Sequence, residues 1–139
     1  MKVAVIYAST TGNTEAMANA IKDAVSAKGA DVVFSTADSA DKNEVLSADI
    51  LLLGSPAMGA EVLEDSMEAF FSDIEGSVSG KKIGLFGSYD WGDGQWLSDW
   101  EDRVKSAGGN LAADSLKVNL TPEDSDLAKC KEWAESAIA

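Results

Sequence analysis

Hydrophobic residues form five short runs, of which the first four are nearly continuous, and between the runs they recur at helical spacing. Runs of this kind are typical of strands that are buried on both faces of a parallel sheet. The last run differs, because Leu116, Val118 and Leu120 alternate with polar residues as in a half-exposed edge strand. The predicted strands are residues 3–7, 32–34, 50–53, 83–87 and 116–120.

Amphipathic helices are predicted between these strands. Apolar residues from Met17 to Val25 and from Met67 to Ile74 recur at spacings of three and four. A third helix is expected over 95–107, and a short helical turn around 44–46. Three helix boundaries are also predicted: Gly29 just past the end of the first helix, Asp65 or Ser66 as the N-cap of the second, and a last helix opened by a Thr121 cap with Pro122 in its first turn.

The alternation of strands and helices indicates an α/β fold with a mainly parallel sheet and helices on both faces. The flavodoxin-like order 2-1-3-4-5 fits the five expected strands, and it puts ligands at the carboxyl ends of the strands. At 139 residues the chain is expected to form one domain, residues 1–139.

Three unusual loops follow the first, third and fourth predicted strands, at residues 9–14, 54–61 and 88–94. The first loop combines hydroxyl side chains with a glycine at the start of a helix, which suits it to hold a phosphate. It lacks the lysine of the nucleotide-binding P-loop and the glycine pattern of dinucleotide-binding folds. Neutral donors and helix-end amides would therefore hold the phosphate.

Composition narrows the classes of partner. The chain has 11 basic and 24 acidic residues, a net charge of −13 and no histidine. This charge argues against nucleic acid and anionic membranes as partners, and it favours partner proteins with basic surfaces, although it also simply aids solubility. The single Cys130 excludes an intrachain disulfide and favours a cytoplasmic location. We expect no signal peptide and no membrane span.

The three loops resemble the flavin-contacting loops of short-chain, clostridial-type flavodoxins. The resemblance rests on residues 8–15 (ASTTGNTE), 54–59 (GSPAMG) and 87–94 (GSYDWGDG), and it covers essentially the whole chain in order. It implies a cofactor, FMN, bound without a covalent bond. It also implies a low-potential electron carrier that uses mainly the semiquinone/hydroquinone couple and has no substrate turnover of its own.

The resemblance also assigns roles to residues. Residues 9–14 would wrap the phosphate, Met58 and Trp91 would sandwich the isoalloxazine ring, and Tyr89 would lie beside that stack. Glu61 would accept a hydrogen bond from flavin N3–H, and the 59–60 peptide would flip on reduction. The complete set of expected cofactor-binding residues is Ser9, Thr10, Thr11, Gly12, Asn13, Thr14, Ser55, Pro56, Ala57, Met58, Gly59, Ala60, Glu61, Ser88, Tyr89, Asp90, Trp91 and Gly92.

Acidic residues crowd the same loops and would disfavour a negatively charged, reduced flavin, which lowers the potential of the second reduction step. The implied partners are a reductase that loads the carrier and low-potential acceptors, docked electrostatically onto a monomer. An FMN-dependent NAD(P)H or quinone reductase of the same fold remains an alternative, as does a scaffold that binds no flavin. A phosphoacceptor signalling domain is rejected, because Ala8, Ser9 and Asn119 stand where it needs acids and a lysine.

Overall fold

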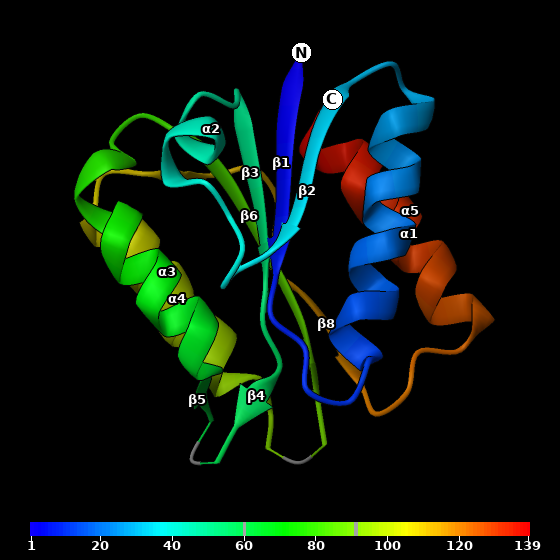
Figure 1. The fold of residues 1–139 in the computed structure, drawn as a ribbon. Coiled ribbons are helices and arrows are strands. Elements are labelled where there is room, and N and C mark those ends of the chain that lie inside the picture. The colour runs from blue at the N-terminus through cyan, green and yellow to red at the C-terminus, as the bar shows by residue number, and fades with distance from the viewer. Residues whose placement is uncertain (60, 91) are drawn as a thin grey trace.

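A parallel sheet forms the centre of the molecule, and helices cover both of its faces (Figure 1). The computed structural model describes residues 1–59, 61–90 and 92–139. The strands of the main sheet are β1 (Lys2–Tyr7), β2 (Asp31–Thr36), β3 (Ile50–Gly54), β6 (Lys82–Tyr89), β7 (Asn110–Leu111) and β8 (Leu116–Asn119). The helices are α1 (Asn13–Ala27), α2 (Lys42–Leu46), α3 (Asp65–Ile74), α4 (Gln95–Ser106) and α5 (Asp124–Ala137), and a 3₁₀ turn follows α3 at Glu75–Ser77.

The predicted strand order is confirmed, with one refinement at the edge of the sheet. Strands β2, β1, β3 and β6 are neighbours in that order, and every pairing is parallel. The fifth position is divided, because β7 pairs with the start of β6 and β8 with its end. This division brings residues 116–119 alongside Phe86–Tyr89, so the edge strand reaches the end of the sheet where the loops emerge.

Alternate side chains of the central strands enter two separate cores, as a period of two requires. On β1, Ala4 and Ile6 pack with α3 and α4, whereas Val3, Val5 and Tyr7 pack with α1 and α5. Figure 1 shows these two helix pairs on opposite sides of the sheet. The continuous apolar runs in the sequence arise from this burial on both faces.

Three of the tryptophans and the cysteine are core residues. Trp96 and Trp100 on α4 are each 1% exposed, and Trp133 on α5 packs edge-on against Phe86 with the ring centroids 5.9 Å apart. Cys130 is buried, and burial raises the pKa of its thiol to about 11. A thiol with so high a pKa is almost wholly protonated at neutral pH, and it is therefore a poor nucleophile.

Two predicted helix starts are wrong by one or two residues. Helix α3 is capped by Glu64, whose carboxylate accepts from the Ser66 amide, and not by Asp65 or Ser66. Helix α5 begins after Glu123, which forms a reciprocal capping box with Asp126, so neither a Thr121 cap nor a first-turn proline applies. In both cases a longer acidic side chain reaches the orphan amides. The end of α1 is as predicted, with Gly29 at φ 87°.

The second predicted loop contains a small antiparallel hairpin that the sequence pattern did not reveal. Strands β4 (Ala57–Met58) and β5 (Val62–Leu63) are two residues each, too short to show alternation. In addition, β6 continues through Ser88 and Tyr89, which were expected in a loop. Among the described residues, no helix is long and apolar enough to cross a membrane.

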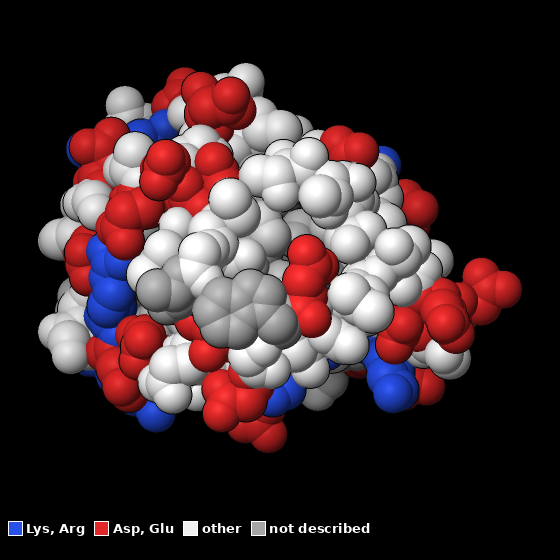
Figure 2. Space-filling model, turned by 90° about the horizontal axis from the view of Figure 1, so that it is seen from below, with Lys and Arg blue, Asp and Glu red and all other residues white. Residues whose placement is uncertain are grey.

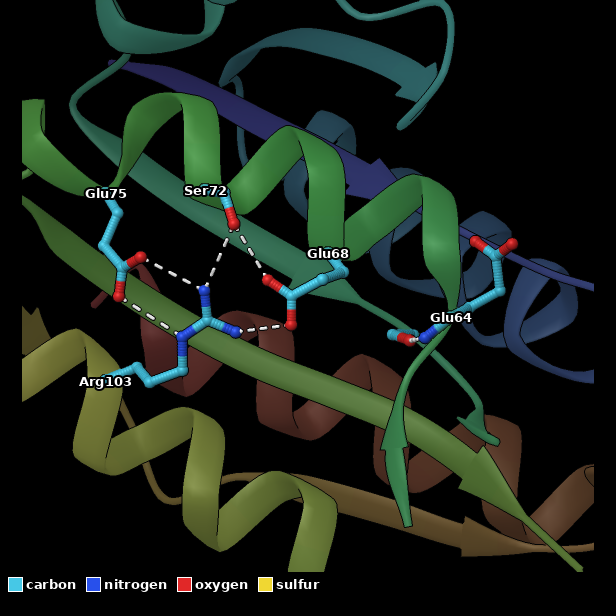
Figure 3. A network of polar contacts seen from close by, with 6 residues as sticks. Glu64, Glu68, Ser72, Glu75 and Arg103 are labelled. Atoms are coloured by element: carbon cyan, nitrogen blue, oxygen red, sulfur yellow. Dashed lines mark hydrogen bonds and ion pairs between the residues drawn. The ribbon is translucent and has the colours of Figure 1, made fainter. Parts of the chain in front are cut away.

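Helices α3 and α4 are joined by a charged network around Arg103 (Figure 3). The Arg103 guanidinium donates to Glu68 at 2.8 Å and to Glu75 at 3.1 Å, and it lies over the Phe71 ring, 4.9 Å from the centroid. These bonds raise the pKa of Arg103 and lower the pKa of the Glu68 carboxyl. The network therefore connects α4 to α3 and to the 3₁₀ turn that follows it.

We expect Arg103→Met to lower the free energy of unfolding by about 1–2 kcal/mol, measured by chemical denaturation. Methionine keeps contact with Phe71 but leaves two carboxylates without their shared partner. The side chains of Arg103, Glu68 and Glu75 are 30%, 47% and 34% exposed, so solvent screens part of the interaction. A loss below about 0.5 kcal/mol, the usual range for a surface substitution, would contradict this role.

The matched control is Lys22→Met, because Lys22 also lies 4.9 Å from a ring centroid, that of Phe34, but among the described residues its one ion pair is with its neighbour Asp23. Its stability should change by no more than about 0.5 kcal/mol.

The effect of Arg103→Met should also depend on pH. A carboxyl with a lowered folded pKa stabilises the fold above its unfolded pKa, and this stabilisation is lost as the pH falls through the folded value. The difference should therefore shrink in acid, below the ordinary Glu value of 4.5.

Candidate functional site

The three loops singled out in the sequence meet at one end of the sheet and enclose a cleft. They follow β1, β3 and β6, which are adjacent parallel strands, so their carboxyl ends lie together. The cleft has a volume of ≈ 250 Å³ and is lined by Thr10, Thr11, Pro56, Ala57, Met58, Gly59, Glu61, Ser88, Tyr89 and Asp90. Figure 2 looks onto this end: uncharged residues occupy much of its middle, and acidic groups lie around them.

The first loop presents backbone amides that have no partner. Gly12, at φ 92°, caps α1 without a side-chain hydrogen bond. The Ser9 hydroxyl accepts from the amides of Gly12 at 3.1 Å and Glu15 at 3.4 Å. Within the part of the chain that the structure describes, the amides at positions 10, 11, 13 and 14 have no acceptor. Four free donors at a helix N-terminus form a cradle for an anion.

A buried pair of hydroxyls ties this loop to the third one. Thr14 Oγ1 and Ser88 Oγ are 2.7 Å apart, and the two residues are 1% and 4% exposed. Since one hydroxyl satisfies the other, neither pays the cost of an unpaired buried polar group. The contact fixes the first turn of α1 against the end of β6.

The second and third loops are pressed together at two glycines. A Cβ on Gly87 would lie 2.0 Å from the Ser55 carbonyl oxygen, and one on Gly54 would lie 2.3 Å from the Phe86 ring. The same Ser55 carbonyl accepts from the indole N–H of Trp96 at 3.1 Å. Ser55 is fully buried, and its hydroxyl donates to the Pro56 carbonyl and accepts from the Glu64 amide. These hydrogen bonds of buried Ser55 thus stabilise the turn that follows β3.

The β4–β5 hairpin carries the second side of the cleft. Met58 is half-buried, and Gly59 has φ 47°. Glu61 follows with φ 55°, a left-handed conformation that is unfavourable for a residue with a Cβ. Its Oε1 accepts from the amides of Gly94 and Gln95, each at 3.1 Å, and so caps α4 from another loop. Gly92 makes room, since a Cβ there would lie 2.5 Å from the Glu61 carboxyl carbon.

The third loop places Tyr89 beside the cleft and Asp90 at its exposed rim. The Tyr89 ring is tilted against buried Trp96, with centroids 5.6 Å apart. Asn119 of β8 donates to the carbonyls of Tyr89 at 3.0 Å and Asp90 at 3.4 Å, and Lys117 donates to that of Asp93 at 2.7 Å. The edge strand therefore holds this loop in place.

The sequence analysis missed the contributions of Lys117 and Asn119. Their only signal was the alternation of the 116–120 strand, which does not show which loop its polar residues meet. Of the predicted set, ten residues line the cleft, whereas Ser9, Gly12, Asn13, Thr14, Ser55 and Gly92 lie behind its walls or shape its loops. Ala60 and Trp91 lie outside the described residues, so their predicted roles remain predictions.

Negative charge surrounds the cleft. Glu61 lines it, Asp90 lies at its rim, and Asp93 belongs to the adjoining turn. Near the anion cradle, the Tyr7 hydroxyl donates to Glu15 at 3.1 Å, and burial together with this carboxylate raises the pKa of Tyr7. An anion in the cradle would meet amides and neutral hydroxyls, since none of the loop residues 9–14 is basic.

Comparison with known proteins identifies the family. The family model described as "Flavodoxin" matches residues 5–133. The chain belongs to the flavodoxin family. A flavodoxin from Megasphaera elsdenii is 46% identical over 97% of both chains, and one from Clostridium beijerinckii is 42% identical over 88% of this chain and 89% of its own.

Solved structures agree. The two-electron reduced flavodoxin of M. elsdenii has a TM-score of 0.86 and 45% identity, and it covers 99% of this chain and 98% of its own. Oxidised flavodoxin 2 from Bacillus cereus has a TM-score of 0.89 at 34% identity, with coverage of 99% and 98%. Flavodoxins bind FMN and transfer electrons to and from redox partner proteins, and they do not turn over a substrate.

The residues of the cleft fit FMN. The free amides and hydroxyls of the first loop suit a phosphate monoester, whereas the thioether of Met58 and the ring of Tyr89 suit a flat aromatic group. The polar and the flat ends of the cleft thus match the two ends of the cofactor.

Proposed function

We propose that this flavodoxin is a low-potential one-electron carrier in which the described loops hold FMN without a covalent bond. The observation that carries the proposal is the cradle of unpartnered amides at one end of a cleft whose other end is lined by Met58, Glu61 and Tyr89. FMN, when bound, supplies the one-electron chemistry. The protein supplies binding, orientation and an electrostatic field.

At the polar end, the amides of residues 10, 11, 13 and 14 donate to the phosphate, together with the exposed hydroxyls of Thr10 and Thr11. The hydroxyl of Thr14 is already paired with that of Ser88, and that of Ser9 with two amides, so these residues chiefly hold the loop in shape. The partial positive charge of the α1 N-terminus adds to the binding. No lysine is required, which keeps the site compatible with a strongly acidic protein.

At the flat end, Glu61 is oriented to accept the flavin N3–H. Its Oε1 receives both amide hydrogen bonds, so the carboxylate is held in one orientation. Its Oε2 has no partner among the described residues and is available to the cofactor. We propose that Met58 packs against one face of the ring, with Tyr89 beside it. The resemblance to short-chain flavodoxins assigns the opposite face to Trp91, which lies outside the described residues.

The hairpin is suited to respond to reduction. Gly59 has φ 47° and can change conformation at little cost, because it has no Cβ. We propose that the peptide between Gly59 and Ala60 turns its carbonyl toward flavin N5 when N5 carries a proton. The surrounding carboxylates lower the potential of the second reduction step, since that step adds negative charge to their field.

Comparison of FMN with riboflavin tests the phosphate loop. The double variant Thr10→Ala, Thr11→Ala should bind FMN about ten- to a hundredfold more weakly, on the order of 1.5–3 kcal/mol, because hydrogen bonds to a charged group are lost. Its affinity for riboflavin, which has no phosphate, should stay within about twofold of the unchanged protein. Fluorescence quenching measures both constants. An equal loss for the two flavins would exclude a phosphate contact for these hydroxyls.

Anaerobic reductive titration tests the carrier function. The FMN-loaded protein should be reduced in two resolved one-electron steps, with a long-wavelength absorbance that rises in the first step and disappears in the second. The second step should lie at a lower potential than that of free FMN. A single two-electron step together with steady NAD(P)H oxidation would instead favour the reductase. A protein that takes up no FMN would contradict both functions.

We propose further that redox partners with basic surfaces dock over the cleft onto a monomer. Exposed apolar Val62 and Leu120, 56% and 53% exposed, lie on the β5 hairpin and just after β8, close to the acidic rim. Exposed apolar side chains together with charged ones at the border are typical of a protein interface. Charge complementarity would then bring the partner to the flavin.

Electron transfer to a basic partner protein should slow by about tenfold or more between low and high salt, because screening weakens long-range attraction. Stopped-flow rates at a fixed protein concentration measure this dependence. Reduced free FMN reacting with the same partner is the control for effects of salt on the partner itself. Rates that do not change with salt would contradict electrostatic docking.

A further inference from the structure

A single peptide bond in the third loop is held between two opposite charges. The carbonyl of Asp93 accepts from Lys117 Nζ at 2.7 Å, and the N–H of Gly94, in the same peptide, donates to Glu61 Oε1 at 3.1 Å. In a trans peptide the carbonyl and the N–H point in opposite directions. Lys117 and Glu61 therefore lie on opposite sides of this one peptide.

The lysine side chain is seated against the loop. A Cβ on Gly94 would lie 2.9 Å from Lys117 Cδ, so the aliphatic stem occupies the space beside this glycine. The ammonium group lies 6.0 Å from the centroid of the Tyr89 ring, which lines the cleft. Lys117 is paired with Gly87 of β6, so the regular pairing of β8 with β6 fixes the position of the Lys117 backbone.

The orientation of this peptide decides what Glu61 meets. With its N–H toward the carboxylate, the peptide adds one of the two bonds that hold Glu61 Oε1. In the reversed orientation its carbonyl would face the carboxylate and repel it. A charged donor on the carbonyl side opposes that reversal, and it also polarises the N–H toward its acceptor.

Among the described residues, Lys117 forms no ion pair. Its side chain lines a hollow together with Asp93, Glu101 and Asp114. In a chain of net charge −13, a cation at the edge of the third loop partly offsets the acidic field over the cleft.

We propose that Lys117 is a positioning residue for Glu61, acting through the 93–94 peptide, and that its charge raises the potential of the second reduction step. The consequence for the cofactor rests on the proposed function, in which Glu61 binds the flavin ring. The orientation of the 93–94 peptide does not rest on the proposed function, because it is a property of the cofactor-free chain.

The experiment compares Lys117→Met, which removes the charge and the donor, with Lys117→Arg, which keeps both. Lys131→Met is the matched control, because Lys131 is exposed on α5 and its substitution changes the net charge equally. Amide hydrogen exchange at Gly94 and Gln95 is measured by NMR in the cofactor-free chain. The affinities for FMN and riboflavin and the two reduction potentials are measured with flavin.

In Lys117→Met, the Gly94 and Gln95 amides should exchange at least about threefold faster, while amides of β1 stay unchanged. Because Glu61 contacts the ring and not the phosphate, FMN and riboflavin should both bind about fivefold more weakly. The fully reduced flavin should lose about twofold more affinity than the one-electron-reduced flavin. At 59 mV per tenfold change this lowers the second potential by about 20 mV. Lys117→Arg should restore all three values, and Lys131→Met should change none of them.

Unchanged exchange at Gly94 in Lys117→Met would overturn the proposal, and so would equal potential shifts in Lys117→Met and Lys131→Met. A loss of FMN affinity without a loss of riboflavin affinity would also contradict it, because it would place the effect at the phosphate. If the unchanged chain binds neither flavin, the proposed function fails, and amide exchange still decides whether Lys117 orients the peptide.

Discussion

The close contact between the ends of β3 and β6 determines the geometry of the whole site. The Ser55 carbonyl lies where a Cβ on Gly87 would be, and the Trp96 indole holds the same oxygen from the core. Only glycine at this point allows the second and third loops to meet as backbone against backbone. The cleft exists because two neighbouring strands can approach this closely before their loops diverge.

Polar groups near this contact divide into two kinds. Those that shape the loops are satisfied within the protein, as the hydroxyls of Ser55, Thr14 and Ser88 show. Those in the first loop are not, since the amides at positions 10, 11, 13 and 14 have no acceptor among the described residues. Water can reach most of these amides, and a phosphate would replace that water with charge-assisted hydrogen bonds. The distribution of hydrogen bonds therefore separates the scaffold from the binding surface.

Glu61 connects the hairpin to α4, and its own backbone is in a strained, left-handed conformation. A left-handed conformation costs a residue other than glycine about 1–2 kcal/mol. Two amide hydrogen bonds and the positive end of the α4 helix offset this cost, since helix α4 has no capping side chain of its own. Strain at a position so close to the cleft is expected where the side chain must point in one direction. The same carboxylate contributes to the acidic field that a reduced flavin would meet.

The sequence by itself determined the class of fold, the strand order and the three loops that meet at the cleft. Continuous apolar runs, helical periodicity and the three loops are local signals, and right-handed parallel crossovers leave few ways to arrange them. The structure also revealed the short hairpin and which acidic side chains cap the helices, whereas tertiary contacts decided the partners of Glu61 and Lys117. Glu61 and Gly94 are 33 residues apart, and Lys117 and Asp93 are 24 apart. No periodicity encodes such pairs, because they arise only when separate strands bring their ends to the same edge of the sheet.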